Sequence, residues 1–67
     1  MNFAERLKEL RAEKGIYQKD LANILHVAPS AVSAWEIGRN EPGNEMLIKI
    51  SDFFDVTVDY LLGKTDY

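Results

Sequence analysis

The fold is decided by residues 18–38, which read QKDLANILHVAPSAVSAWEIG. The apolar spacing in this stretch predicts a short helix over residues 18–25 and a second that runs through residues 30–37. Pro29 suits the first turn of the second helix, because its missing N–H would have no partner there. Gly38 is expected to end that helix. Helices this short, joined by a tight turn, cross steeply because they cannot pack antiparallel.

The second helix of the pair is expected to have two different faces. Val32 and Trp35, three residues apart, would fix it to the core, and the small Ala22 of the first helix would allow close approach. The opposite face carries small or weakly polar side chains without a carboxylate: Pro29, Ser30, Ser33, Ala34 and Ile37. A helix that enters the DNA major groove, roughly 12 Å wide, needs such a face. The pattern therefore favours a helix-turn-helix.

The rest of the chain is also predicted to be helical. Further helices are expected between Asn2 and Gly15, over about residues 44–54, and from Thr57 as N-cap to Gly63. Asn2 and Glu5 have the spacing of a capping box, and His26 is expected to adopt a left-handed conformation in the turn. Since no strand alternation, repeat or linker is found, residues 1–67 are predicted to form a single all-α domain of five short helices.

Length and composition exclude several classes of protein. The chain has 67 residues, a net charge of −3 and no cysteine, so a βαβ nucleotide fold, a disulfide framework and a thiolate metal cage are not expected. The apolar stretches are only a few residues long, and no cleavable leader precedes them. A membrane span and a secretory signal are therefore not expected, and a reducing cytoplasm suits the composition.

The acidity of the chain is confined to one region. Residues 1–40 carry six basic and five acidic side chains, whereas residues 41–67 carry two basic and six acidic ones. The net charge of the whole chain argues against nucleic acid as a partner. Its regional distribution shows that the predicted helix-turn-helix is about neutral, so the acidity limits affinity for nucleic acid without excluding it.

No enzyme chemistry is predicted from the titratable and nucleophilic residues. His26 has no cysteine or clustered carboxylates with which to bind a metal, and a role in the turn is favoured. Ser30 and Ser33 lack a histidine and an acid that would activate them. The aspartates near residues 52–59 lack the spacing of a calcium loop. No catalytic residue, metal, cofactor or small-molecule ligand is therefore expected.

Several motifs resemble one family closely. They are Gln18-x-x-Leu21-Ala22, Val27-x-x-x-x-Val32-Ser33-x-Trp35-Glu36-x-Gly38, then Pro42 and Leu47, and the ending Val56-x-Val58-Asp59-Tyr60-Leu61-Leu62-Gly63. Together they resemble the lambda-repressor/Cro (XRE) type of helix-turn-helix protein over residues 2–63. The resemblance implies a compact five-helix lambda-repressor-like domain and a prokaryotic or phage-like transcriptional regulator, in the first instance a repressor. Such a protein binds a pseudo-palindromic operator in double-stranded DNA as a homodimer.

The resemblance also implies roles for individual residues. Base-facing positions are occupied by Pro29, Ser30, Ser33 and Ala34. Phosphate-facing positions are occupied by Tyr17, Gln18, Lys19, Ile37, Arg39 and Asn40. Arg11 and Glu36 match a structural ion pair, and Val58, Tyr60 and Leu61 match a dimer interface.

The chain departs from the family pattern in ways that bear on function. Tyr17 and Ala28 stand where the family has capping residues, so two N-caps are expected to be lost, and His26 replaces a turn glycine. The base-facing positions hold no Arg, Lys, Asn or Gln for bidentate base contacts. A second function therefore stays open, namely an antitoxin-like protein-interaction module of the same fold for which DNA binding is secondary.

Overall fold

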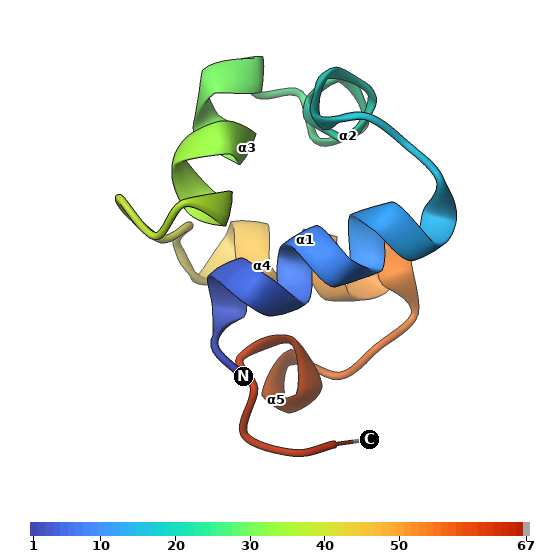
Figure 1. The fold of residues 1–67 in the computed structure, drawn as a ribbon, viewed down its shortest axis with the longest axis vertical. Coiled ribbons are helices and arrows are strands. Elements are labelled where there is room, and N and C mark those ends of the chain that lie inside the picture. The colour runs from blue at the N-terminus through green and yellow to red at the C-terminus, as the bar shows by residue number, and fades with distance from the viewer. Residues whose placement is uncertain (67) are drawn as a thin grey trace.

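Five helices follow one another along residues 1–66, the part of the chain that the computed structural model describes (Figure 1). They are α1 (Phe3–Lys14), α2 (Gln18–Leu25), α3 (Pro29–Glu36), α4 (Asn44–Phe54) and α5 (Val58–Leu61). No strand occurs within residues 1–66, so the predicted all-α fold is confirmed. Figure 1 shows α1 across the middle of the molecule, with α2 and α3 at one end and α5 with both termini at the other.

Local capping fixes both ends of α1. The Asn2 side chain accepts a hydrogen bond from the Glu5 backbone N–H at 2.9 Å, and Glu5 Oε1 accepts one from the Asn2 N–H at 3.2 Å. At the other end, Gly15 has φ 70° and its N–H donates to the carbonyl groups of the last turn. The predicted capping box and glycine stop are therefore both present.

The turn between α2 and α3 is built without glycine. His26 adopts φ 61°, the left-handed conformation that the sequence predicted for it. Tyr17 and Ala28 cap α2 and α3 without a side-chain hydrogen bond, as expected from their residue types. The Asp20 carboxylate nevertheless accepts from the Tyr17 backbone N–H at 2.9 Å, so half of a capping box remains at α2. The third helix ends at Glu36, one residue before the predicted end.

The core draws at least one buried apolar side chain from every helix. The residues that form it are Phe3, Leu7, Leu10, Leu21, Ala22, Leu25, Val32, Trp35, Ile50, Phe54 and Leu61. Burial of a side chain such as Leu or Val contributes about 1.5–3 kcal/mol. Val32 and Trp35 lie inward as predicted, so the opposite face of α3 is left toward solvent.

Within residues 1–66, no helix is both long enough and apolar enough to cross a lipid bilayer.

Candidate nucleic-acid interface

The outward face of α3 presents the residues predicted to face DNA bases. Pro29 and Ser30 are exposed, whereas Ser33 and Ala34 are half-buried at the edge of the helix. Ile37, the C-cap residue, keeps 65% of its surface exposed although it is large and apolar. Residues 30, 33, 34 and 37 have the spacing of one helical stripe, so they form a continuous, uncharged surface.

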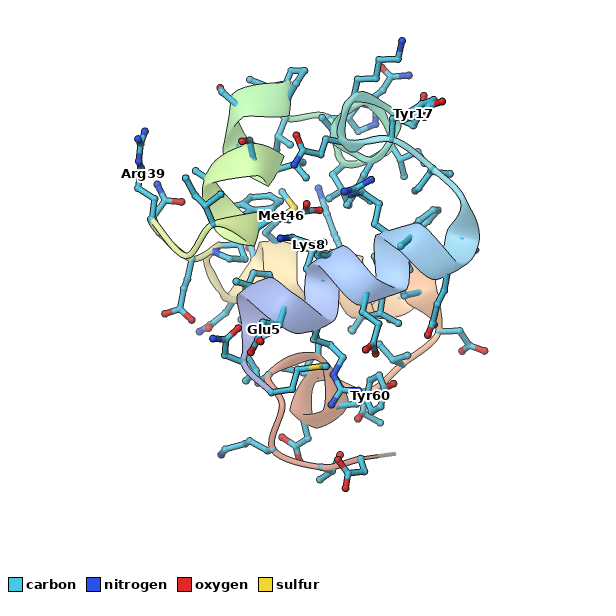
Figure 2. All side chains as sticks on the ribbon, viewed as in Figure 1. Glu5, Lys8, Tyr17, Arg39, Met46 and Tyr60 are labelled. Atoms are coloured by element: carbon cyan, nitrogen blue, oxygen red, sulfur yellow. The ribbon has the colours of Figure 1, made fainter. Side chains whose placement is uncertain are left out.

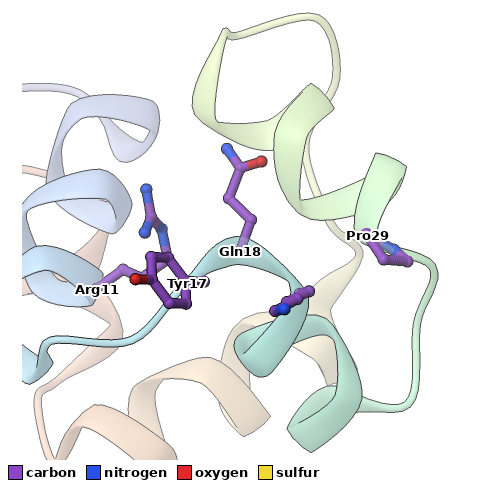
Figure 3. A pocket seen from close by; sticks show the side chains of 5 residues that line it. Arg11, Tyr17, Gln18 and Pro29 are labelled. Carbon is purple, nitrogen blue, oxygen red and sulfur yellow. The ribbon is translucent and has the colours of Figure 1, made fainter.

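The N-terminal ends of α2 and α3 border a surface hollow of about 510 Å³. Its lining combines residues from three elements: Arg11 of α1, Tyr17, Gln18 and Lys19 at the start of α2, and Pro29 of α3 (Figure 3). The Tyr17 side chain is 71% exposed, and the ammonium of Lys19 lies 5.9 Å from the centroid of its ring. Three of the predicted phosphate-facing residues are thus brought together next to a base-facing one.

A hydrogen-bonded network connects this hollow to α3. Arg11 Nε donates to Glu36 Oε2 at 2.7 Å and Arg11 Nη2 donates to Glu36 Oε1 at 3.1 Å, so the expected partners form a bidentate ion pair. Arg11 Nη1 also donates to the Ile16 carbonyl at 2.8 Å. Gln18 Nε2 donates to Glu36 Oε1 at 3.0 Å, and Figure 3 shows its side chain extending toward α3. The network therefore fixes α3 against both α1 and α2.

The contact between Gln18 and Glu36 was not predicted from the sequence. The family pattern implied a phosphate for Gln18, and eighteen residues separate it from its partner. A signal was available, because a buried carboxylate has more lone pairs than one guanidinium can satisfy. Glu36 needs a further donor, and Gln18 is the amide at the adjacent helix start.

The charges of the network stabilise one another. Burial raises the pKa of the Glu36 carboxyl, but the hydrogen bonds from Arg11 and Gln18 and the positive charges of Arg11 and Lys8 outweigh it. The pKa of Glu36 consequently lies below its ordinary value. The hydrogen bond to Glu36 raises the pKa of Arg11 against the opposing effect of burial. Glu36 is therefore ionised at neutral pH, and its charge is neutralised inside the domain.

The loop after α3 supplies the remaining predicted phosphate contacts. Arg39 and Asn40 are exposed, and the Arg39 backbone N–H donates to the Ala34 carbonyl at 2.9 Å, which ties the loop to the end of α3. In Figure 2, Arg39 and Tyr17 project from the molecule on opposite sides of α3. A groove-bound α3 would thus have polar or cationic groups on both flanks.

The predicted dimer residues differ in how deeply they are buried. Val58 and Tyr60 are half-buried, whereas Leu61 is completely buried and its side chain has no surface left for a partner. Val58 lines an apolar hollow of about 280 Å³ with Asn44, Leu47 and Ile48. Ile48 keeps 53% of its surface exposed. Sequence reasoning missed Ile48, although its position beside the inward stripe of α4 was a signal.

Among residues 1–66, no three His, Cys, Asp or Glu side chains are grouped so that they could hold a metal ion.

Comparison with known proteins agrees with the helix-turn-helix arrangement of α2 and α3. A family model described as helix-turn-helix matches residues 7–61. The HTH-type transcriptional activator BcrR of Enterococcus faecalis is 47% identical over 63 residues, which are 94% of this chain and 31% of BcrR. The HTH-type transcriptional regulator ImmR of Bacillus subtilis is 36% identical over 66 residues, 98% of this chain and 52% of ImmR. The chain thus spans about half or less of these curated relatives.

A solved structure matches over almost the whole of both chains. The P22 c2 repressor, crystallised in complex with a synthetic operator, superposes with a TM-score of 0.90 at 31% sequence identity. The match covers 97% of this chain and 98% of that one. The lambda-repressor-like fold predicted from the motifs is confirmed by this likeness.

Proposed function

This chain belongs to the XRE-type helix-turn-helix family, and on that premise we propose that it regulates transcription, in the first instance as a repressor, by placing α3 in the major groove of an operator. The observation that carries this proposal is the uncharged outward face of α3, flanked by the hollow at the start of α2. A bacterial or phage-infected cytoplasm, where the DNA lies, is the proposed place of action.

Phosphate contacts are proposed on both sides of the groove. The N-terminus of α2 attracts an anion, because its first N–H groups lack intrahelical partners and carry the positive end of the helix dipole. The Gln18 amide has two N–H groups, of which one donates to Glu36, so the other is left for a phosphate oxygen. Tyr17 and Lys19 extend this site. On the other side of α3, Ile37, Arg39 and Asn40 contact the sugar–phosphate backbone of the DNA.

Base contacts are proposed for Pro29, Ser30, Ser33 and Ala34. The serine hydroxyls donate or accept, and the Ala34 methyl group can contact the methyl of thymine. A bidentate side-chain pair contributes about 1–3 kcal/mol of discrimination, and none of these four residues can form one. We therefore expect modest discrimination per base and a larger contribution from DNA shape and deformability.

A homodimer is proposed through the surface of α4 and α5. The apolar hollow at Leu47, Ile48 and Val58 and the half-buried ring of Tyr60 supply a surface on which a second copy can pack. A dimer would place two α3 helices about 34–36 Å apart, on successive turns of one face of the DNA. Dimerisation also supplies the affinity that a near-neutral helix-turn-helix lacks.

The proposal is tested by titrating the protein against random and genomic-upstream duplexes at several salt concentrations. The binding constant should fall as salt rises, because cationic groups displace counterions from phosphates. Arg39→Ala should weaken binding to every duplex and reduce the salt slope by about 1, whereas Ser33→Ala should change sequence preference. Lys64→Ala is the matched control, because this exposed lysine follows α5 at the other end of the molecule.

One observation favours the alternative of a protein-interaction module. The acidic residues after position 40 are all exposed among residues 1–66: Glu41, Glu45, Asp52, Asp55, Asp59 and Asp66. Such a surface suits a basic protein partner better than DNA. Absence of DNA binding even at low salt would eliminate the operator proposal and leave this one.

A further inference from the structure

Tertiary contacts must fix the position of α5, because the helix has only four residues. A single turn is not stable by itself, since the cost of nucleating a helix is recovered only over several turns. Thr57 caps its first turn through a 3.0 Å hydrogen bond to the Tyr60 N–H, and Leu61 enters the core. Thr57 acts at the start of the helix and Leu61 in the core, and a further side chain contacts α5 at Tyr60.

Arg6 of α1 supplies that further contact. Its guanidinium carbon lies 3.8 Å from the centroid of the Tyr60 ring, so the cation stacks on the aromatic face. Arg6 Nη2 donates to the Thr65 carbonyl at 3.4 Å, and Nη1 lies 3.8 Å from Glu9 Oε1. Figure 2 shows Tyr60 beside α5. One side chain thus connects α1, α5 and the segment after α5.

The burial of Arg6 is costly. The residue is only 6% exposed, and its Nε is buried without a hydrogen-bond partner among the described residues. Removing a cation from water is unfavourable unless partners compensate it, and an unsatisfied N–H adds to the cost. An apolar side chain would fill the same space without that cost. The arginine therefore does more than fill space, because an aliphatic residue could reproduce neither its contact with the Tyr60 ring nor its polar contacts with Thr65 and Glu9.

The stacking orients the opposite side of α5. Successive residues of a helix are about 100° apart, so Tyr60 and Val58 point to nearly opposite sides. Arg6 holds the Tyr60 side against α1, while Val58 completes the apolar hollow with Leu47 and Ile48. Loss of the stacking would let α5 rotate and would remove Val58 from that surface.

The N-terminal residues hold the other end of α5 as well. Gly63 follows the helix with φ 79°, and a Cβ at this position would collide with the carbonyl oxygen of Met1. The backbone of the first residue therefore lies directly against the end of α5. The two ends of segment 1–6 therefore contact the α5 region, Met1 at Gly63 and Arg6 at Tyr60.

We propose that Arg6 is a positioning residue for dimerisation, which acts by stacking on Tyr60 and thereby presents Val58 to a second copy of the chain. The inference rests on the homodimer of the proposed function. The inference goes beyond the proposed function because Arg6 is buried and does not itself contact the second copy, so its effect on assembly is indirect.

The test compares Arg6→Ala with Lys8→Ala by sedimentation equilibrium. Both substitutions remove one positive charge from α1, but Lys8 is exposed and its charge acts on Glu36, whereas Arg6 stacks on Tyr60. Arg6→Ala should weaken the dimer about tenfold, which lies between the effects of an exposed and a desolvated cation–π contact, and Lys8→Ala should leave it unchanged. If Arg6→Ala does not fold, Arg6→Lys keeps the charge, loses the planar stacking and should weaken the dimer by a smaller factor.

Substitutions of Tyr60 separate positioning from direct contact. Tyr60→Phe retains the ring and should dimerise as the wild type does, whereas Tyr60→Leu removes the stacking and should weaken the dimer as Arg6→Ala does. The double variant should then be no worse than either single one, because both changes remove the same contact. Additive losses would show that Tyr60 affects the dimer independently of Arg6, and would overturn the inference.

A half-site duplex provides a readout that a general loss of stability would not reproduce. Arg6→Ala should reduce affinity for a two-half-site duplex and leave affinity for a single half-site unchanged, since α3 is not touched. Equal losses on both duplexes would assign Arg6 to folding alone. A wild type that dimerises, with an Arg6→Ala variant that dimerises equally well, overturns the inference and leaves the proposed function intact. A wild type that is monomeric with and without DNA overturns the dimer, and this inference with it.

Discussion

At the scale of single residues, Glu36 connects α3, the proposed base-contacting helix, to α1 and α2. Its carboxylate accepts two hydrogen bonds from Arg11 and one from Gln18, and the side chain is almost completely buried. It occupies the last turn of α3, directly before Ile37. This ionised group therefore adds to core packing in fixing α3 relative to the start of α2, and with it the distance between the proposed base-facing and phosphate-facing residues.

The first prediction concerns the pH dependence of this group. Because the pKa of Glu36 is lower in the folded state than its ordinary value of 4.5, ionised Glu36 stabilises the fold above that pH. This contribution to the free energy of unfolding is lost as the pH falls from 4.5 through the lower pKa that Glu36 has in the folded state. Glu36→Gln should lower the free energy of unfolding at pH 7 by about 3 kcal/mol, the lower end expected for a broken buried pair.

Urea denaturation of the wild type and Glu36→Gln, repeated between pH 7 and pH 3, measures this effect. The difference between the two free energies of unfolding should shrink as the pH falls below 4.5. Glu13→Gln on the exposed face of α1 is the control, and its difference from the wild type should stay small throughout. A constant difference for Glu36→Gln would show that its charge does not stabilise the pair.

At the scale of elements, α2 and α3 are weakly capped for their length. Each has eight residues, and neither N-cap side chain donates or accepts a capping hydrogen bond. Asp20 compensates in part at α2, and Pro29 pre-sets the backbone at the start of α3. These helices therefore depend on tertiary packing, chiefly through the fully buried Leu21 and Val32.

A cap restored at α3 should stabilise the domain. Ala28 already has the extended backbone of an N-cap residue, with φ −71° and ψ 146°, so a serine there can accept from an unpaired N–H of the first turn. Ala28→Ser should raise the free energy of unfolding by about 1 kcal/mol and the melting temperature by about 4–8 °C. Thermal denaturation followed by circular dichroism measures the shift.

The same substitution inside a helix should act in the opposite direction. Ala12→Ser lies at an exposed position of α1, where serine has a lower helix propensity than alanine and caps nothing. It should lower the melting temperature slightly. If both variants shifted the melting temperature alike, capping of α3 would not explain the effect of Ala28→Ser.

At the scale of the whole molecule, the net negative charge lies in a different part of the chain from the helix-turn-helix. The longest dimension is 28 Å, and in Figure 1 it runs from the α2–α3 end to the α5 end. The excess of acidic over basic residues follows position 40, whereas the helix-turn-helix precedes it. Ions screen charges over about 8 Å at physiological ionic strength, so acidic groups at the α5 end are screened from phosphates at the other end.

This separation predicts a salt-dependent effect of Asp66, which lies beyond α5. At 0.15 M salt, Asp66→Asn should leave DNA affinity unchanged. At 0.01 M salt the screening length rises to about 30 Å, and the same substitution should raise affinity up to about twofold. Lys19→Ala, at the proposed phosphate site, should lower affinity at both salt concentrations. Fluorescence anisotropy with a labelled duplex distinguishes these outcomes, and an effect of Asp66→Asn at 0.15 M would place acidic charge near the DNA.

The five helices, most of their caps and the inward stripes of α1 to α4 follow from local sequence patterns. Asn2 with Glu5, Gly15, His26 and Thr57 each fix the backbone within a few residues, so their effects were predictable without knowledge of the packing. The same holds for the outward face of α3, because helical periodicity alone places Ser30 and Ala34 opposite Val32.

The contacts between residues far apart in the sequence depend on tertiary packing. Gln18 on Glu36, Arg6 on Tyr60, and Leu61 in the core depend on the rotation and crossing of separate helices. A helix turns by about 100° per residue, so a small rotation changes which side chain faces the core, its neighbour or solvent. Local patterns do not specify that rotation. It is set by the joint packing of all five helices around one core, and this packing positions the proposed DNA-binding and dimer surfaces.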